Sequence, residues 1–202
     1  MENNLPIDIK ILNPPQNIIF LDVDGVLNNQ LFYERNFKHL QQYNKIPLYK
    51  TVKKLLKKLV KKKEIGRLEY YKSQIDIDSM ELLNELCAET NSAVVLSASM
   101  RGSWDVLTLN RIFQYCGATF TIIDKTGHSD CRVRGVEIHQ WLKEFSEKWF
   151  GLPYHQFNNY VILDDDSDIL LWQQHNFFHV DRYVGLTPNI CWKIKRFLKY
   201  KV

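Results

Sequence analysis

The sequence has few cysteines and no long apolar run, and each absence excludes a class of protein. Its four cysteines lie far apart, without a CxxC pair or the ligand spacing of a zinc site. No stretch approaches the roughly 20 apolar residues that a membrane-spanning helix needs, and the chain does not open with a signal-peptide pattern. We therefore expect reduced thiols, a cytoplasmic location and no transmembrane segment.

Several well-known catalytic motifs are also missing. Cys131 and Arg134 are too close together for the Cys-x5-Arg loop of a cysteine phosphatase. The chain has no Gly-x4-Gly-Lys-Ser/Thr loop of a nucleotide kinase and no HExxH zinc motif, so we expect ordinary core or surface roles for its histidines. No positioned histidine accompanies Ser97 and Asp22, as a serine hydrolase would require.

Positive charge is concentrated in two zones, although the formal net charge is only +4. Eight lysines lie between Lys50 and Lys63, and the last ten residues contain five more basic residues. Apolar residues recur at helical spacing within the first zone, at Val52, Leu55, Leu56, Leu59 and Val60. The Lys50–Lys63 helix is therefore expected to bind RNA or an anionic membrane surface, or an acidic protein. The alternative is a solvated helix face that binds nothing.

Apolar runs alternate with helical patterns along most of the chain. Strands are expected at 17–22, 93–97, 119–124, 160–164 and 177–181, and helices from 78, at 104–116, 135–150 and 169–175, and after Thr187-Pro188. This order predicts an α/β fold with a parallel sheet, whose ligands bind at the carboxyl ends of the strands. We expect a single domain over residues 1–202, with its core at about 14–28 and 77–202 and a small helical insertion at about 29–76.

Acidic residues gather where two of the strands end. Asp22-Val-Asp24-Gly25 follows the first strand, and Asp164-Asp-Asp-Ser-Asp168 follows a later one. Crowded carboxylates repel one another unless a cation neutralises them, and an all-oxygen cluster favours a hard ion such as Mg²⁺. A single acidic loop would more simply cap a helix or lie in solvent, but two such loops at strand ends favour a metal site.

Groups that could bind a phosphate follow the intervening strands. Ser97 ends the second strand and offers a hydroxyl and a backbone N–H. Two residues are candidates for the cation that would offset charge on a transferred phosphoryl group: Lys125 after the third strand, and Arg134 at the start of a helix. Either could instead be a surface charge.

The order of these parts resembles the haloacid dehalogenase (HAD) superfamily. More narrowly, the stretches at 20–28, 94–99, 123–126, 134–142, 160–168 and 185–187 are similar to the HAD domain of Swiss army knife RNA repair proteins. The resemblance implies a HAD-like Rossmannoid three-layer sandwich with a small helical cap. Two departures affect the substrate rim: Ser97-Ala-Ser-Met-Arg101 replaces the more usual Ser-Ser-Ser-Trp-Arg, and Gly127 stands where a proline is expected.

The resemblance also implies roles for single residues. Asp22 would be the nucleophile that becomes phosphorylated, and Asp24 the general acid and base. Mg²⁺ would be held by Asp22, the backbone carbonyl of Asp24 and Asp164, with Asp168 at the family spacing and Asp165 as a further ligand or support. Ser97 would bind the phosphoryl group together with Arg134, with Lys125 as the second choice for the cation.

We therefore expect a Mg²⁺-dependent phosphomonoesterase acting on a phosphorylated macromolecule. The short insertion implies a partly open site that admits a phosphorylated residue or a polymer end. The aromatic residues of the insertion, and a broad similarity to HAD-type tyrosine phosphatases that include effectors delivered into host cells by intracellular bacteria, favour a phosphotyrosine protein phosphatase. The alternative is an RNA-repair phosphatase that acts on polynucleotide ends. A second alternative is a non-catalytic module that binds nucleic acid or a membrane surface.

Overall fold

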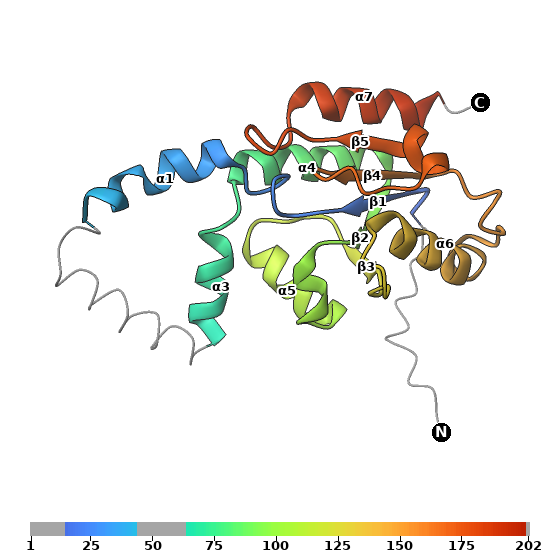
Figure 1. Cartoon of the computed structure of the whole chain (residues 1–202), viewed down its shortest axis with the longest axis horizontal. Coiled ribbons are helices and arrows are strands. Elements are labelled where there is room, and N and C mark those ends of the chain that lie inside the picture. Colours follow the sequence, from blue (N-terminus) through green and yellow to red (C-terminus); the bar gives the residue numbers. More distant parts are fainter. Residues whose placement is uncertain (1–14, 44–63, 201–202) are drawn as a thin grey trace.

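The computed structural model describes residues 15–43 and 64–200, and its centre is a parallel sheet (Figure 1). The strands are β1 (Asn17–Leu21), β2 (Ser92–Leu96), β3 (Ile122–Lys125), β4 (Tyr160–Asp164) and β5 (Phe177–His179). Their order in the sheet is β3-β2-β1-β4-β5, with every pairing parallel. The predicted α/β fold with a parallel sheet is confirmed.

Helices cover both faces of this sheet. They are α4 (Ile77–Thr90), α5 (Val106–Tyr115), α6 (Arg134–Phe150) and α7 (Pro188–Lys199), with short 3-10 helices η1 (Ser99–Gly102) and η2 (Leu171–Asn176). Asp76 caps the start of α4, and Thr187 with Pro188 begins α7 as the sequence predicts. The short helix expected at 169–175 is the 3-10 helix η2.

The central strand β1 shows why the fold has three layers. All of its side chains are buried, and they alternate between two hydrophobic clusters. Ile19 and Leu21 pack with α4, α5 and α7, whereas Ile18 and Phe20 pack with α6. Burial of each such side chain contributes about 1.5–3 kcal/mol, so an apolar run with two buried faces is the expected sequence of a central parallel strand.

Two strands are shorter than the sequence predicts. β3 begins at Ile122 rather than at residue 119, and its register with β2 shifts between Val94 and Val95. β5 ends at His179, so the acidic residue Asp181 lies in the following turn, where its side chain accepts a hydrogen bond from the Tyr183 amide. These irregularities lie on the two outer strands, where fewer hydrogen bonds fix the ends.

The segment between β1 and α4 contributes helices α1 (Gln30–Tyr43) and α3 (Glu64–Lys72), seen at the left of Figure 1. The predicted basic helix at 51–63 lies outside the described residues. α3 packs on the core near α5: the Trp104 indole donates a 2.9 Å hydrogen bond to the Tyr71 hydroxyl. None of the described helices has the length and apolar character that a membrane span would require.

Candidate active site

The carboxyl ends of three neighbouring strands meet at one edge of the sheet. Asp22 follows β1, Ser97 follows β2, and Asp164 is the last residue of β4. Backbone hydrogen bonds continue the pairing beyond β1: the Asp22 amide donates to the Leu163 carbonyl and the Ser97 amide to the Leu21 carbonyl, at 3.0 and 2.9 Å. The strand order β2-β1-β4 therefore places these three side chains next to one another.

Three carboxylates converge at this edge. Asp22, Asp164 and Asp165 each offer an oxygen within 4.8 Å of the other two. Burial, and then the neighbouring Asp164, raise the pKa of Asp22 to about 7. Burial also raises the pKa of Asp164 to about 6, although the Asp166 amide and Arg134 oppose the shift. Such crowding favours a bound cation, which would stabilise the ionised forms.

Arg134 provides positive charge beside this cluster. It is the first residue of α6, its Nη2 lies 3.1 Å from Asp22 Oδ1, and its Nε lies 3.2 Å from Asp164 Oδ2. The Asp164 contact is an ion pair without hydrogen-bond geometry, and Asp164 Oδ2 accepts no hydrogen bond within residues 15–43 and 64–200. The buried Nη1 of Arg134 also has no partner among the described residues, so this guanidinium retains a donor that can bind an anion.

Lys125, the other candidate for the cation, contacts different atoms. Its ammonium group donates to the backbone carbonyls of Arg101 and Trp104, at 2.7 and 2.6 Å. These bonds hold the loop that follows β2. The structure thus brings Arg134, but not Lys125, into contact with the carboxylates of Asp22 and Asp164.

The hydroxyl of Ser97 is fully buried, and no residue in the described part of the chain hydrogen-bonds to it. A buried polar group without a partner is unfavourable, and it is often found where a ligand completes the bonding. Both Ser97 Oγ and Arg134 Nη1 are such groups on elements that surround Asp22. They are the candidate donors to a tetrahedral anion.

Asp24 lies at the exposed end of the first acidic turn. Asn28 donates a 2.7 Å hydrogen bond from Nδ2 to Asp24 Oδ1, and the Asn28 Oδ1 accepts one of 3.0 Å from the Gly25 amide. These bonds fix the direction of a carboxylate that solvent can reach. Tyr33 lies in the first turn of α1, and its burial and the nearby Asp24 raise its pKa.

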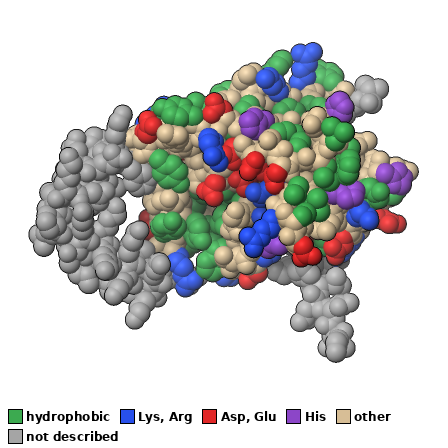
Figure 2. Space-filling view, viewed as in Figure 1, with side chains coloured by type: hydrophobic (Ala, Val, Ile, Leu, Met, Phe, Trp, Pro, Cys, Tyr) green, Lys and Arg blue, Asp and Glu red, His purple; other side chains and the backbone are tan. Residues whose placement is uncertain are grey.

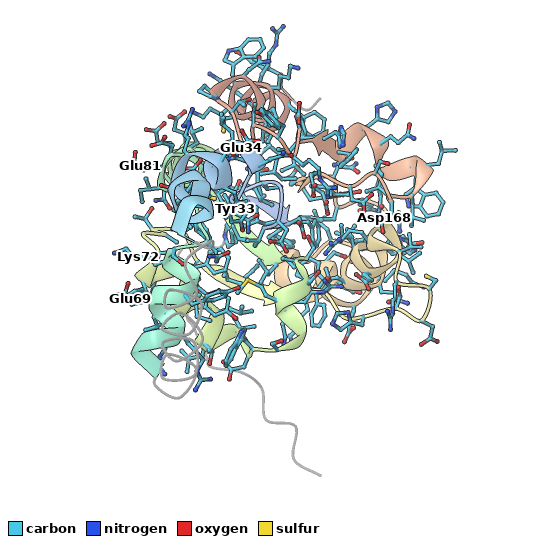
Figure 3. The ribbon with its side chains drawn as sticks, turned by 60° about the vertical axis from the view of Figure 1, so that its left-hand side comes forward. Tyr33, Glu34, Glu69, Lys72, Glu81 and Asp168 are labelled. Atoms are coloured by element: carbon cyan, nitrogen blue, oxygen red, sulfur yellow. The ribbon has the colours of Figure 1, made fainter. Side chains whose placement is uncertain are left out.

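Asp168 is not among the three converging carboxylates. Its Oδ2 accepts a 2.8 Å hydrogen bond from the Arg134 amide, and its carbonyl accepts one of 3.0 Å from the Gly135 amide. Asp168 thus satisfies the free amides at the start of α6 and orients Arg134. Figure 3 shows Asp168 on the side of the molecule away from the labelled residues of α1 and α3.

The three clustered carboxylates fit a hard divalent ion such as Mg²⁺. They supply only oxygen ligands, and Asp164 Oδ2 lacks a hydrogen-bond partner in the described structure. The expected ligands Asp22, Asp164 and Asp165 therefore lie together, whereas the Asp168 side chain is bonded to the start of α6.

A pocket of about 510 Å³ lies beside Arg134 and is lined by Ser99, His128, Arg132, Asp166 and Asp168, among others. This volume is within the range of about 300–1,000 Å³ of small-ligand sites, so a group larger than phosphate has room there. Figure 2 shows acidic side chains gathered beside basic ones near the middle of the face in view.

Sequence reasoning missed Arg101, Asn28 and Arg182. Arg101 is buried and paired with Glu137, and the exposed Arg182 donates to Asp165 at 2.9 Å. A signal existed for Arg101, which ends the Ser97–Arg101 stretch that carries the family resemblance. Asn28 ends the stretch at 20–28, which also carries the resemblance, but nothing local in the sequence marks Arg182.

Comparison with known proteins gives one family. The family described as "HAD domain in Swiss Army Knife RNA repair proteins" matches residues 18–190, a range that includes every residue of the site described above. No curated protein and no solved structure matches the chain. The matched range covers most of the chain and the parallel sheet has the expected form, so the chain belongs to this family of HAD domains.

Proposed function

We propose that this chain is a Mg²⁺-dependent phosphomonoesterase in which Asp22 is the nucleophile. The observation that carries the proposal is the convergence of Asp22 with Asp164 and Asp165 beside Arg134. HAD domains are generally metal-dependent hydrolases, and phosphatases are common among them. Mg²⁺ held by the three carboxylates would offset their charge and that of the phosphate oxygens.

The first step transfers the phosphoryl group to the protein. A carboxylate oxygen of Asp22 attacks phosphorus while the bond from phosphorus to the leaving oxygen breaks, and its electron pair goes to that oxygen. Asp24, in its protonated form, gives the leaving oxygen its proton. Ser97 Oγ and Arg134 donate hydrogen bonds to the non-bridging oxygens.

The second step regenerates the carboxylate. Asp24, now ionised, takes a proton from a water molecule as that water attacks phosphorus. The bond between phosphorus and the Asp22 oxygen breaks, which releases inorganic phosphate and the free Asp22 carboxylate. Asp24 is again protonated, so the cycle balances. Asn28 orients Asp24 for both transfers through its 2.7 Å hydrogen bond.

For the substrate we propose a phosphorylated polynucleotide end. The sequence alone favours phosphotyrosine because the insertion is short and rich in aromatic residues, but no contact of the described residues selects a phenyl ring. The family description names RNA repair, and the pocket beside Arg134 has room for a nucleotide next to the phosphate. The phosphotyrosine peptide therefore becomes the comparison substrate.

The test is phosphate release by the purified chain, with Mg²⁺ or with EDTA. Substrates are an RNA oligonucleotide with a terminal phosphate and a phosphotyrosine peptide, and Asp22→Asn serves as the control. Metal-dependent turnover of the RNA end that is lost in Asp22→Asn supports the proposal. Turnover of the peptide alone would overturn the substrate class. Absence of turnover of either, with retained RNA binding, would favour a non-catalytic module.

A further inference from the structure

A buried ion pair lies behind the phosphate-binding side of the site. Arg101 in η1 donates from Nη2 to Glu137 Oε2, and the two residues are only 4% and 3% exposed. Glu137 lies in the first turn of α6. The pair therefore joins the loop after β2 to the helix that carries Arg134.

The guanidinium of Arg101 also binds four backbone carbonyls. On the loop after β2 it donates to Ser97 and Ala98, the latter at 3.0 Å. On the loop after β3 it donates to Thr126 and Gly127, at 3.2 and 3.4 Å. One side chain thus connects both loops and, through Glu137, the start of α6.

Glu137 extends the same connection. Its second carboxylate oxygen accepts a 3.1 Å hydrogen bond from the Ser129 amide. Glu137 also lies three residues after Arg134, so the two side chains leave neighbouring positions on one face of α6. Fixing Glu137 therefore fixes the rotation and height of the turn from which Arg134 reaches Asp22.

Two of the buried donors that lack a partner among the described residues lie at the two ends of this connection, and a third, Thr126 Oγ1, lies on the loop after β3. Ser97, whose carbonyl Arg101 binds, holds the free hydroxyl, and Arg134 holds the free Nη1. We propose that Arg101 and Glu137 are positioning residues that hold Ser97 and Arg134 at the separation a tetrahedral oxyanion requires. The proposal rests on the phosphatase function proposed above. It states that the Arg101–Glu137 pair sets the positions of the two groups that would bind the phosphate oxygens.

Energetics support a role beyond stability. Two buried charges lose hydration, and a well-packed apolar pair often stabilises a fold as well or better. What an apolar pair cannot do is bind carbonyls from two loops in fixed directions. Donors held in place before the substrate arrives need no reorganisation during the reaction, which is the usual source of large electrostatic effects in catalysis.

The metal cluster is built from other elements. Its carboxylates follow β1 and β4, whereas the Arg101 connection joins the loops after β2 and β3 to α6. Loosening the connection should therefore weaken oxyanion binding and leave Mg²⁺ binding nearly unchanged. A general destabilisation of the fold would instead weaken both oxyanion binding and Mg²⁺ binding.

The experiment measures two affinities in each variant: that for Mg²⁺ alone, and that for inorganic phosphate in the presence of Mg²⁺, both by calorimetry. Arg101→Lys keeps the charge but loses the planar set of donors. The double variant Arg101→Met with Glu137→Met leaves no unpaired buried charge. Asn110→Ala is the control, since Asn110 ties α5 to the start of β3 through two hydrogen bonds with the Ile122 backbone, away from the site.

We expect Arg101→Lys and the double variant to bind phosphate at least about tenfold more weakly, since misplacement by about 1 Å can cost a hundredfold. Their Mg²⁺ affinity should stay within about twofold, and so should both affinities of Asn110→Ala. Unchanged phosphate affinity in the folded double variant, or a parallel loss of both affinities, would overturn the proposal. If the wild-type chain binds phosphate but hydrolyses no ester, the phosphatase proposal fails and the binding measurement still decides the role of the pair.

Discussion

The backbone of Gly25 lies directly against the side chain of Asp165. A Cβ built on Gly25 would come within 2.9 Å of the Asp165 Cβ and closer still to its carboxyl group, and Gly25 has a φ of +80°. Gly25→Ala should therefore displace Asp165, strain the Asp24 turn, and cost roughly 1–3 kcal/mol of unfolding free energy. We expect weaker Mg²⁺ binding as well, measured by calorimetry on the folded variant.

Gly151→Ala provides the matched control. Gly151 has a φ of +65°, but its added Cβ would meet nothing within 4 Å. The Gly151→Ala variant should lose about 1–2 kcal/mol of unfolding free energy because of the backbone conformation alone, and its Mg²⁺ affinity should not change. Equal Mg²⁺ affinity in the two variants would show that contact with Asp165 is irrelevant to the metal site.

Asp22→Asn should lower phosphate release by at least about a thousandfold, because an amide cannot act as the attacking nucleophile. The amide is close in shape to the carboxylate, so the fold should persist, as circular dichroism and chemical denaturation would show. Retention of wild-type turnover by this variant would exclude Asp22 as the nucleophile.

Without metal, stability should fall as the pH rises between about 4 and 7. The pKa of Asp22 rises from its usual 3.8 to about 7 in the folded protein. Between these values the folded state binds more protons than the unfolded state, so a rising pH favours unfolding. Added Mg²⁺ should stabilise the protein more at higher pH, because it binds the ionised carboxylates.

Chemical denaturation in EDTA and in Mg²⁺, at about pH 5 and about pH 8, would test this dependence. Asp22→Asn removes one of the two carboxyl groups whose pKa is raised, and Asp164 remains, so the metal-free stability of the variant should change less over the same range. If wild type and variant show the same slope, another group is responsible.

The sequence predicts the centre of this fold better than its edges. β1 and β4 are buried on both faces, so their apolar runs identify them directly. The start of β3 depends on a register shift against β2, which no local pattern encodes. The acidic residues after β1 and β4 follow from the strand ends, because parallel strands bring those ends to one edge.

Contacts between distant segments could not be predicted in the same way. Arg101 is buried because Glu137, 36 residues later, pairs with it. Asp168 bonds the Arg134 amide across 34 residues, so its spacing from Asp164 suggests a metal ligand where the structure shows a contact with the start of a helix. The direction of a long side chain depends on such distant partners. For this reason the sequence alone could not show that Arg134 contacts Asp22 whereas Lys125 contacts loop carbonyls.

Because Arg134 and Lys125 contact different groups, we expect their substitutions to have different effects on activity and stability. Arg134→Met removes a donor that faces the oxyanion site and leaves Asp22 without its ion pair, so kcat/KM should fall by about a hundredfold or more. Lys125→Met removes two bonds to loop carbonyls, so it should act first on thermal stability, with a smaller loss of activity. Steady-state kinetics well below each melting temperature compare the two, with Arg134→Lys as the conservative variant. A greater loss of kcat/KM in Lys125→Met than in Arg134→Met would assign the phosphate-binding cation to Lys125, because a role confined to the loop carbonyls could not produce it.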